Sequence, residues 1–195
     1  MANVDCPKGL QVAGPLLRAT WYAVAASQAS PIFIGDPVLA TGTSNQVIVA
    51  TAASASLITG AVIGVYDGTK LPGVVNSSGV RLAYAPSVQS SAFYVLVADH
   101  PDQLFIAQGD GDTTYLDMDD CGGTLDLVAS SAGNTTSGWS AWELDDSDTG
   151  SVGVEQIRLV RPVDRPDNTV GIAYCDWYCK INTHQLSSGS VGAGK

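Results

Sequence analysis

The sequence predicts a mainly β fold, either a small β-barrel or a β-sandwich, and three features support this. Turn-forming residues recur about every ten positions, with short runs of β-branched and aromatic residues between them. The 21 glycines among 195 residues suit tight turns. No long stretch keeps the i, i+3, i+4, i+7 apolar spacing that an amphipathic helix needs. We therefore expect short strands joined by turns, without helical modules between them.

The chain divides into three regions by composition. Residues 1–20 form an expected extended N-terminal arm, in which two prolines and two glycines interrupt any regular element. This arm is either a flexible terminus or a segment that orders against a neighbouring subunit. Residues 21–186 form the β-rich core domain, and residues 187–195 form a Gly/Ser tail that we expect to be flexible.

The clearest local signal lies between Pro31 and Ala40, where two apolar runs flank Gly35-Asp36-Pro37. Gly35 can adopt a positive φ, and Pro37 lacks an N–H group and restricts the residue before it. The segment therefore predicts a strand, a sharp corner and a second strand. Asp36 is interpreted as a turn residue and not as a ligand. We expect its sheet partners in residues 57–67 and 93–98.

Apolar runs of β-forming residues predict the remaining strands. These lie at Trp21–Val24, Gln46–Ala50, Leu57–Asp67, Val80–Tyr84, Ser91–Ala98, Gln103–Gln108, Leu125–Ser130, Trp139–Leu144, Glu155–Arg161 and Ala173–Asn182. Only the turn at residues 99–102 separates Ser91–Ala98 from Gln103–Gln108, so we expect these two strands to pair as a hairpin. Residues 47–66 carry no charge, but their Ser, Thr and Gly content and their alternation favour strands over a membrane span.

The charge balance bears on possible partners. The formal net charge is −10, and the nine Lys and Arg residues are scattered, which argues against binding to a phosphate backbone. Charged residues make up 14% of the chain, against roughly 25% in a typical protein. The first residues lack a basic segment followed by an apolar one, so no signal peptide is expected. We predict neither a nucleic-acid nor a membrane partner.

An acidic stretch is the strongest candidate for a metal site. Five aspartates gather between residues 110 and 120, and hard cations prefer several carboxylate oxygens: Asp110, Asp112, Asp117, Asp119 and Asp120. The stretch does not match an EF-hand loop, because the glycine is misplaced and no Glu stands at the twelfth position. Residues 145–148 form another acidic turn. Solvated acidic turns are the favoured interpretation, and no metal ligand is predicted.

Catalytic signals are weak. Only His100 and His184 could act as a general base at neutral pH, and no G-x-S-x-G nucleophile motif accompanies them. No Gly-rich phosphate loop or dinucleotide fingerprint is present. We therefore predict no catalytic residue, no cofactor and no enzymatic activity.

The cysteines and tryptophans suggest packing. Cysteines stand at positions 6, 121, 175 and 179. On a strand, the last two would lie about 13 Å apart, too far for a disulfide, so buried free thiols are expected. Four aromatic side chains could stack on sugar rings: Trp139, Trp142, Trp177 and Tyr178. Packing in the core or at its rim is the favoured role for the first two.

Several motifs together resemble a known family. They are Met1–Asp5, Ile32–Val38, Ile58–Val65, Tyr94–Ile106 and Arg161–Leu186, and they occur in the same order over most of the chain. In this respect the sequence is similar to small structural proteins of tailed bacteriophages that are encoded near the major capsid gene. These proteins are regarded as capsid decoration, or cement, proteins.

The resemblance implies a role on the virion. Such a protein would be made in the host cytoplasm and would bind the outside of the expanded icosahedral shell, commonly as a homotrimer. Its partner would be the major capsid protein. The cysteines and the acidic stretch 110–126 do not map onto the family. Two alternatives stay open: another phage structural β-barrel, at the head–tail joint or in the tail, and a carbohydrate- or calcium-binding β module.

Overall fold

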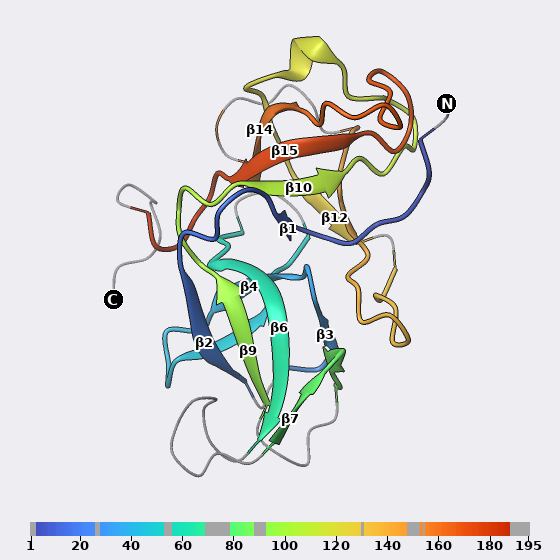
Figure 1. Cartoon of the computed structure of the whole chain (residues 1–195). Coiled ribbons are helices and arrows are strands. Elements are labelled where there is room, and N and C mark those ends of the chain that lie inside the picture. The colour runs from blue at the N-terminus through green and yellow to red at the C-terminus, as the bar shows by residue number, and fades with distance from the viewer. Residues whose placement is uncertain are drawn as a thin grey trace.

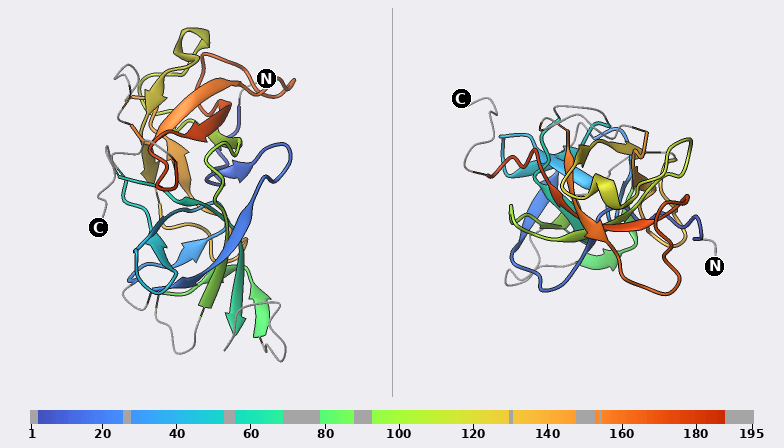
Figure 2. Two further views of the ribbon diagram at one scale, coloured as in Figure 1. Left: turned by 90° about the vertical axis from the view of Figure 1, so that its left-hand side faces the viewer. Right: turned by 90° about the horizontal axis from the view of Figure 1, so that it is seen from above.

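A computed structural model describes residues 3–25, 28–52, 56–68, 79–87, 93–129, 131–147, 153 and 155–187. Within these ranges it contains fifteen strands and one short 3₁₀-helix, so the predicted mainly β fold is confirmed. The molecule is elongated, and two β lobes are stacked along its length (Figures 1 and 2). We call them the barrel and the second lobe.

Five strands close the barrel. They are β2 (Ala19–Val24), β4 (Pro37–Ala40), β5 (Gln46–Val49), β6 (Gly60–Gly68) and β9 (Phe93–Ala98). The order around the barrel is β4-β5-β2-β9-β6, and β6 pairs back with β4. Only β2 and β5 run parallel. Strand β7 (Gly79–Leu82) extends the sheet beside β6, and β3 (Ile32–Phe33) pairs with β8 (Tyr84–Ala85). Inside lie mostly β-branched side chains, among them Val38, Val47, Val62, Val95 and Val97.

The predicted corner exists and turns the chain from β3 into β4. Gly35 has a φ of 97°, and a side chain there would overlap the carbonyl oxygen of Lys8 in the arm. The Asp36 side chain accepts a hydrogen bond from the Phe33 N–H at 2.8 Å, which confirms its role as a turn residue. Of the two sheet partners expected for the corner segment, residues 57–67 are confirmed and residues 93–98 are wrong. Strand β4 pairs with β5 and β6, whereas β9 lies between β2 and β6.

The second lobe is a five-stranded antiparallel sheet with a two-stranded ribbon beside it (Figure 1). The sheet order is β1 (Gln11–Val12), β10 (Phe105–Gln108), β15 (Asp176–Ile181), β14 (Ile157–Pro162) and β11 (Thr124–Leu125). The ribbon pairs β12 (Leu127–Ala129) with β13 (Trp142–Leu144), and the 3₁₀-helix η1 spans Met118–Asp120. The core of this lobe also takes in Ala61 and Ala98 from barrel strands, so apolar packing is continuous between the lobes.

The predicted hairpin of residues 91–98 with 103–108 is wrong. Strand β9 pairs with β2 and β6 in the barrel, and β10 pairs with β1 and β15 in the second lobe. The chain crosses between the lobes here, and side chains fix the crossing. The Asp99 carboxylate accepts hydrogen bonds from Arg18 at 2.8 Å and from the Tyr22 hydroxyl at 2.9 Å. The Gln103 side chain accepts from the Leu17 N–H at 2.9 Å.

The N-terminal segment, predicted as an extended arm, packs on its own chain. Leu10 is only 1% exposed and lies in the core of the second lobe. Its N–H donates to the Gly35 carbonyl at 2.9 Å. The Gln108 side chain binds the Cys6 N–H at 2.8 Å and the Val4 carbonyl at 3.0 Å. The arm is therefore part of the folded unit from residue 3 onward. The predicted tail lies outside the described residues after residue 187.

Candidate functional site

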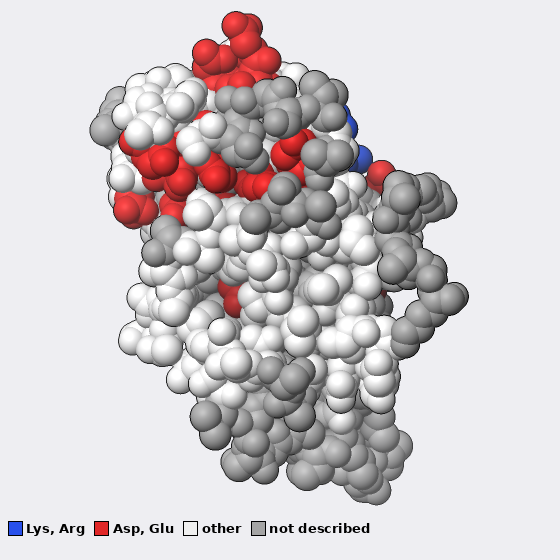
Figure 3. Space-filling model, turned by 180° about the vertical axis from the view of Figure 1, so that it is seen from behind, with Lys and Arg blue, Asp and Glu red and all other residues white. Residues whose placement is uncertain are grey.

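Charge is divided unequally along the molecule. All but three of the 19 acidic residues follow residue 98, and the exceptions are Asp5, Asp36 and Asp67. Residues 19–98, which supply all the barrel strands, contain only four charged residues: Asp36, Asp67, Lys70 and Arg81. On the face shown in Figure 3, acidic residues gather over the second lobe, and few charged groups are visible among the described residues below them. The two lobes therefore present chemically different surfaces.

Three carboxylates meet at one point of the second lobe. Oxygen atoms of Asp110, Asp112 and Asp146 all lie within 4.8 Å of one another. Asp112 is exposed, Asp110 is partly exposed, and Asp146 is only 2% exposed. In the sequence, the first two belong to the acidic stretch 110–120, and the third belongs to the separate acidic turn 145–148.

Parallel pairing brings these segments together. Gly109, just after β10, forms a parallel bridge with Leu144 at the end of β13, so the residues that follow both strands emerge at the same end. The Asp110 N–H donates to the Leu144 carbonyl at 3.0 Å. The Gly111 N–H donates to Oδ2 of Asp146 at 3.0 Å, and the Asp146 N–H donates to Oδ1 of Asp110 at 3.3 Å. The backbone therefore fixes the spacing of the carboxylates.

Three carboxylates this close together repel one another when all are negatively charged. Burial and then the neighbouring Asp110 and Asp112 carboxyls raise the pKa of Asp146 to about 8. None of the four ion pairs among the described residues includes any of the three aspartates. Such a group of oxygen atoms can hold a hard cation, or it can share a proton.

Two of the other aspartates in the acidic stretch, Asp117 and Asp120, have local structural roles. Asp117 caps η1, because its Oδ1 accepts from the Asp119 N–H at 2.8 Å. Asp120 completes the capping box by accepting from the Asp117 N–H at 2.8 Å. Asp119 is exposed. The interpretation as solvated turns therefore fits these three residues, whereas Asp146, in the second acidic turn, is buried.

The two histidines are held by local contacts. His184 is 1% exposed, and burial lowers its pKa to about 4, so it is neutral at pH 7. Its Nδ1 accepts from the Leu186 N–H at 3.0 Å. Nδ1 of His100 accepts from the Asp102 N–H at 3.1 Å and so stabilises the turn after β9. These contacts give both imidazoles a structural role.

The aromatic side chains do not form one sugar-stacking platform. Trp142 and Trp177 are 7% and 0% exposed and belong to the core, whereas Trp139 is partly exposed. Tyr178 is also partly exposed, and the guanidinium of Arg161 lies 4.7 Å from the centre of its ring. The preference for packing therefore holds for Trp142.

The cysteine prediction is confirmed for the CxxxC pair. Cys175 and Cys179 are buried free thiols, and burial raises their pKa values to about 11 and about 12. Cys6 and Cys121 are free and exposed. The buried pair therefore contributes to packing.

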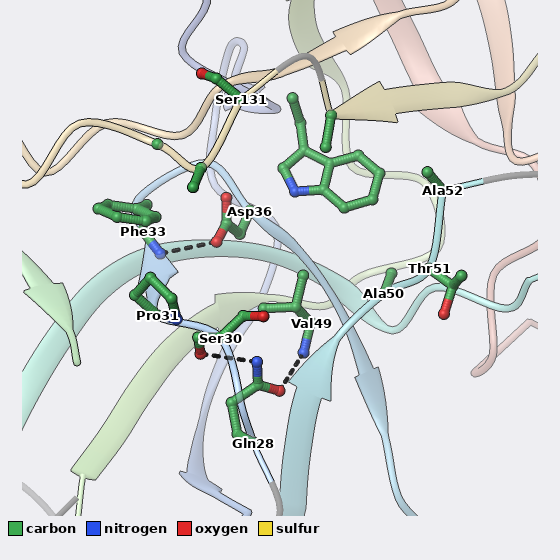
Figure 4. A pocket seen from close by; sticks show the side chains of 14 residues that line it. Gln28, Ser30, Pro31, Phe33, Asp36, Val49, Ala50, Thr51, Ala52 and Ser131 are labelled. Carbon is green, nitrogen blue, oxygen red and sulfur yellow. Dashed lines mark hydrogen bonds between the residues drawn. The ribbon is translucent and has the colours of Figure 1, made fainter. Parts of the chain in front are cut away.

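A pocket of about 390 Å³ lies beside the corner (Figure 4). Two of the polar side chains that line it, Gln28 and Asp36, have partners within the protein. The Gln28 side chain binds the Ser30 carbonyl at 2.8 Å and the Val49 N–H at 3.0 Å. Asp36 binds Phe33, and burial raises its pKa to about 6. These two side chains therefore help to hold the backbone around the corner.

Comparison of the chain with protein-family models, with curated proteins and with solved structures finds no match in any of the three. Among the described residues, no helix has both the length and the apolar character needed to cross a membrane.

Proposed function

We propose that this chain is a structural virion protein that binds the outer surface of an expanded bacteriophage capsid and stabilises the shell. The proposal rests first on the ordered set of motifs that resemble capsid decoration proteins. The major capsid protein is its partner, and the bound form is a homotrimer. No catalytic step is part of this role.

The unequal distribution of charge is the structural observation that supports the proposal. The cores of protein interfaces are depleted in charged residues, and the barrel offers a surface of that kind. Exposed barrel residues in the loop between β4 and β5 are small and polar without charge, as at Gly42, Thr43 and Ser44. We therefore assign the barrel to the capsid side and the acidic second lobe to the solvent side.

The proposed arrangement also agrees with simple electrostatics. A lobe that carries most of the negative charge gains nothing from approaching packaged DNA, which is itself negative. Facing the solvent, it keeps the particle soluble. Many copies on one lattice, joined as trimers, bind more firmly than their individual contacts suggest because the binding is multivalent.

Reconstitution tests the proposal. Purified protein is mixed with expanded capsids that lack it, and bound protein and the thermal stability of the shell are measured. We expect saturable binding at a fixed number of copies per capsid and a higher disruption temperature. No bound protein at saturating concentration, with unchanged shell stability, would contradict the proposal.

A matched pair of variants tests the orientation. Thr43→Glu places a charge on an exposed barrel loop, and Asp119→Lys reverses a charge on the second lobe. We expect the first to weaken capsid binding more than the second. Light scattering, which gives the mass in solution, separates this proposal from the alternative of a head–tail joining protein. Such a protein forms rings of more subunits than a trimer.

A further inference from the structure

The cluster of Asp110, Asp112 and Asp146 differs from an ordinary acidic surface in one respect. Asp146 is only 2% exposed, and its Oδ1 has no hydrogen-bond partner among the described residues, while Oδ2 accepts the Gly111 N–H. A buried carboxylate oxygen without a partner is costly, because it has lost water and gained nothing in return. The site therefore needs either a proton shared between the carboxyls or a bound cation.

We propose that a calcium ion binds between these three carboxylates and joins the segment after β10 to the segment after β13. All the ligands that the cluster offers are oxygen atoms, which are the ligands that calcium prefers. The ion would neutralise the mutual repulsion of the carboxylates and give the buried oxygen of Asp146 a partner. This inference does not depend on the proposed capsid role.

The kind of site favours calcium over magnesium. Calcium accepts six to eight oxygen ligands at about 2.3–2.6 Å in a flexible geometry, and oxygen atoms within 4.8 Å of one another can share one such sphere. Magnesium demands a near-ideal octahedron and gives up its water reluctantly, so a site of three carboxylates from two loops suits it less well. No His or Cys belongs to the cluster, which disfavours zinc.

The exposure of Asp112 indicates the expected affinity. Three protein carboxylates supply only part of the six to eight oxygen ligands of calcium, so water must complete the sphere on the exposed side. Open sites of this kind bind with dissociation constants of about 10⁻⁴–10⁻³ M.

Calorimetry and thermal unfolding of the full chain test the proposal. The protein is stripped with EDTA, dialysed and titrated with calcium chloride or magnesium chloride. At a calcium concentration about 100-fold above the dissociation constant, we expect the unfolding temperature to rise by roughly 5–10 °C. Magnesium at the same concentration should give less than half of that rise. Absence of both binding heat and a calcium-dependent shift at 10-fold above about 10⁻³ M would overturn the proposal.

Three variants locate the site. Asp112→Asn removes an exposed ligand charge with little risk to folding and should weaken calcium binding at least 10-fold. Asp146→Asn keeps the shape of the buried side chain and should abolish the calcium-dependent shift. The control Asp119→Asn removes an exposed aspartate of the same stretch and should respond like the wild type. An unchanged calcium response in Asp112→Asn and Asp146→Asn would also overturn the proposal, whatever the outcome of capsid binding.

Discussion

Replacing Leu10 by alanine should destabilise the whole protein, although the residue lies in the N-terminal arm. Leu10 is 1% exposed and packs in the core of the second lobe. The substitution removes three buried carbon atoms, worth about 0.8 kcal/mol each, and leaves a cavity behind. We therefore expect a loss of about 3 kcal/mol in the free energy of unfolding. Urea denaturation monitored by tryptophan fluorescence measures it.

The matched control is Leu16→Ala, since Leu16 belongs to the same arm and is 49% exposed. Its cost should stay below about 0.5 kcal/mol, as at other exposed positions without specific contacts. If the two variants are equally stable, the arm is not part of the core and the described packing is wrong. By the same reasoning, deletion of residues 1–20 should unfold the protein, because it removes Leu10, strand β1 and the start of β2.

Further predictions concern the corner, the crossing between the lobes, the thiols and the pH dependence. Asp36→Ala should cost about 1–3 kcal/mol because the Phe33 N–H loses its acceptor, whereas Asp36→Asn, which keeps an acceptor oxygen, should cost less in the same urea assay. Tyr22→Phe removes the hydrogen bond to the Asp99 carboxylate and should cost about 1.5–3 kcal/mol; a cost near zero would show that this bond does not fix the crossing. A thiol reagent should modify the exposed Cys6 and Cys121 in the native protein, and the buried Cys175 and Cys179 only after unfolding. In EDTA, the free energy of unfolding should fall as the pH rises from about 4 to about 8. Folding raises the pKa of Asp146 from 3.8 to about 8, so in this pH range the folded state holds a proton that the unfolded state has lost. A flat pH profile, after subtraction of the same profile for Asp146→Asn, would contradict that assignment.

Local features of the fold could be predicted from the sequence because their causes are local. Alternation of apolar residues and the turn residues between them located most strands within a few positions. The corner needed only Gly35 and Pro37, since backbone restrictions of these residue types act over one or two positions. The capping box of Asp117 and Asp120 is also local, although the sequence analysis interpreted these residues only as solvated turns.

Non-local features could not be predicted in the same way. The hairpin prediction failed because sequence proximity favours pairing of neighbouring strands, whereas here the side chains at Asp99 direct the chain into another sheet. Asp146 was separated from Asp110 by 36 positions, and only the parallel bridge between Gly109 and Leu144 brings them together. Nothing in the composition of either acidic turn indicates that one carboxylate is buried.

The two proposals together constrain when calcium would bind. A site with a dissociation constant of about 10⁻⁴–10⁻³ M stays largely empty at calcium levels below that range and fills at extracellular levels. A capsid protein made in the host cytoplasm would then assemble without the ion and acquire it after release. The second lobe, which we place on the solvent side, is where such an ion has access through the exposed Asp112. The measured affinity decides this order, because a dissociation constant below about 10⁻⁶ M is that of an intracellular sensor or buffer and would place calcium binding before assembly.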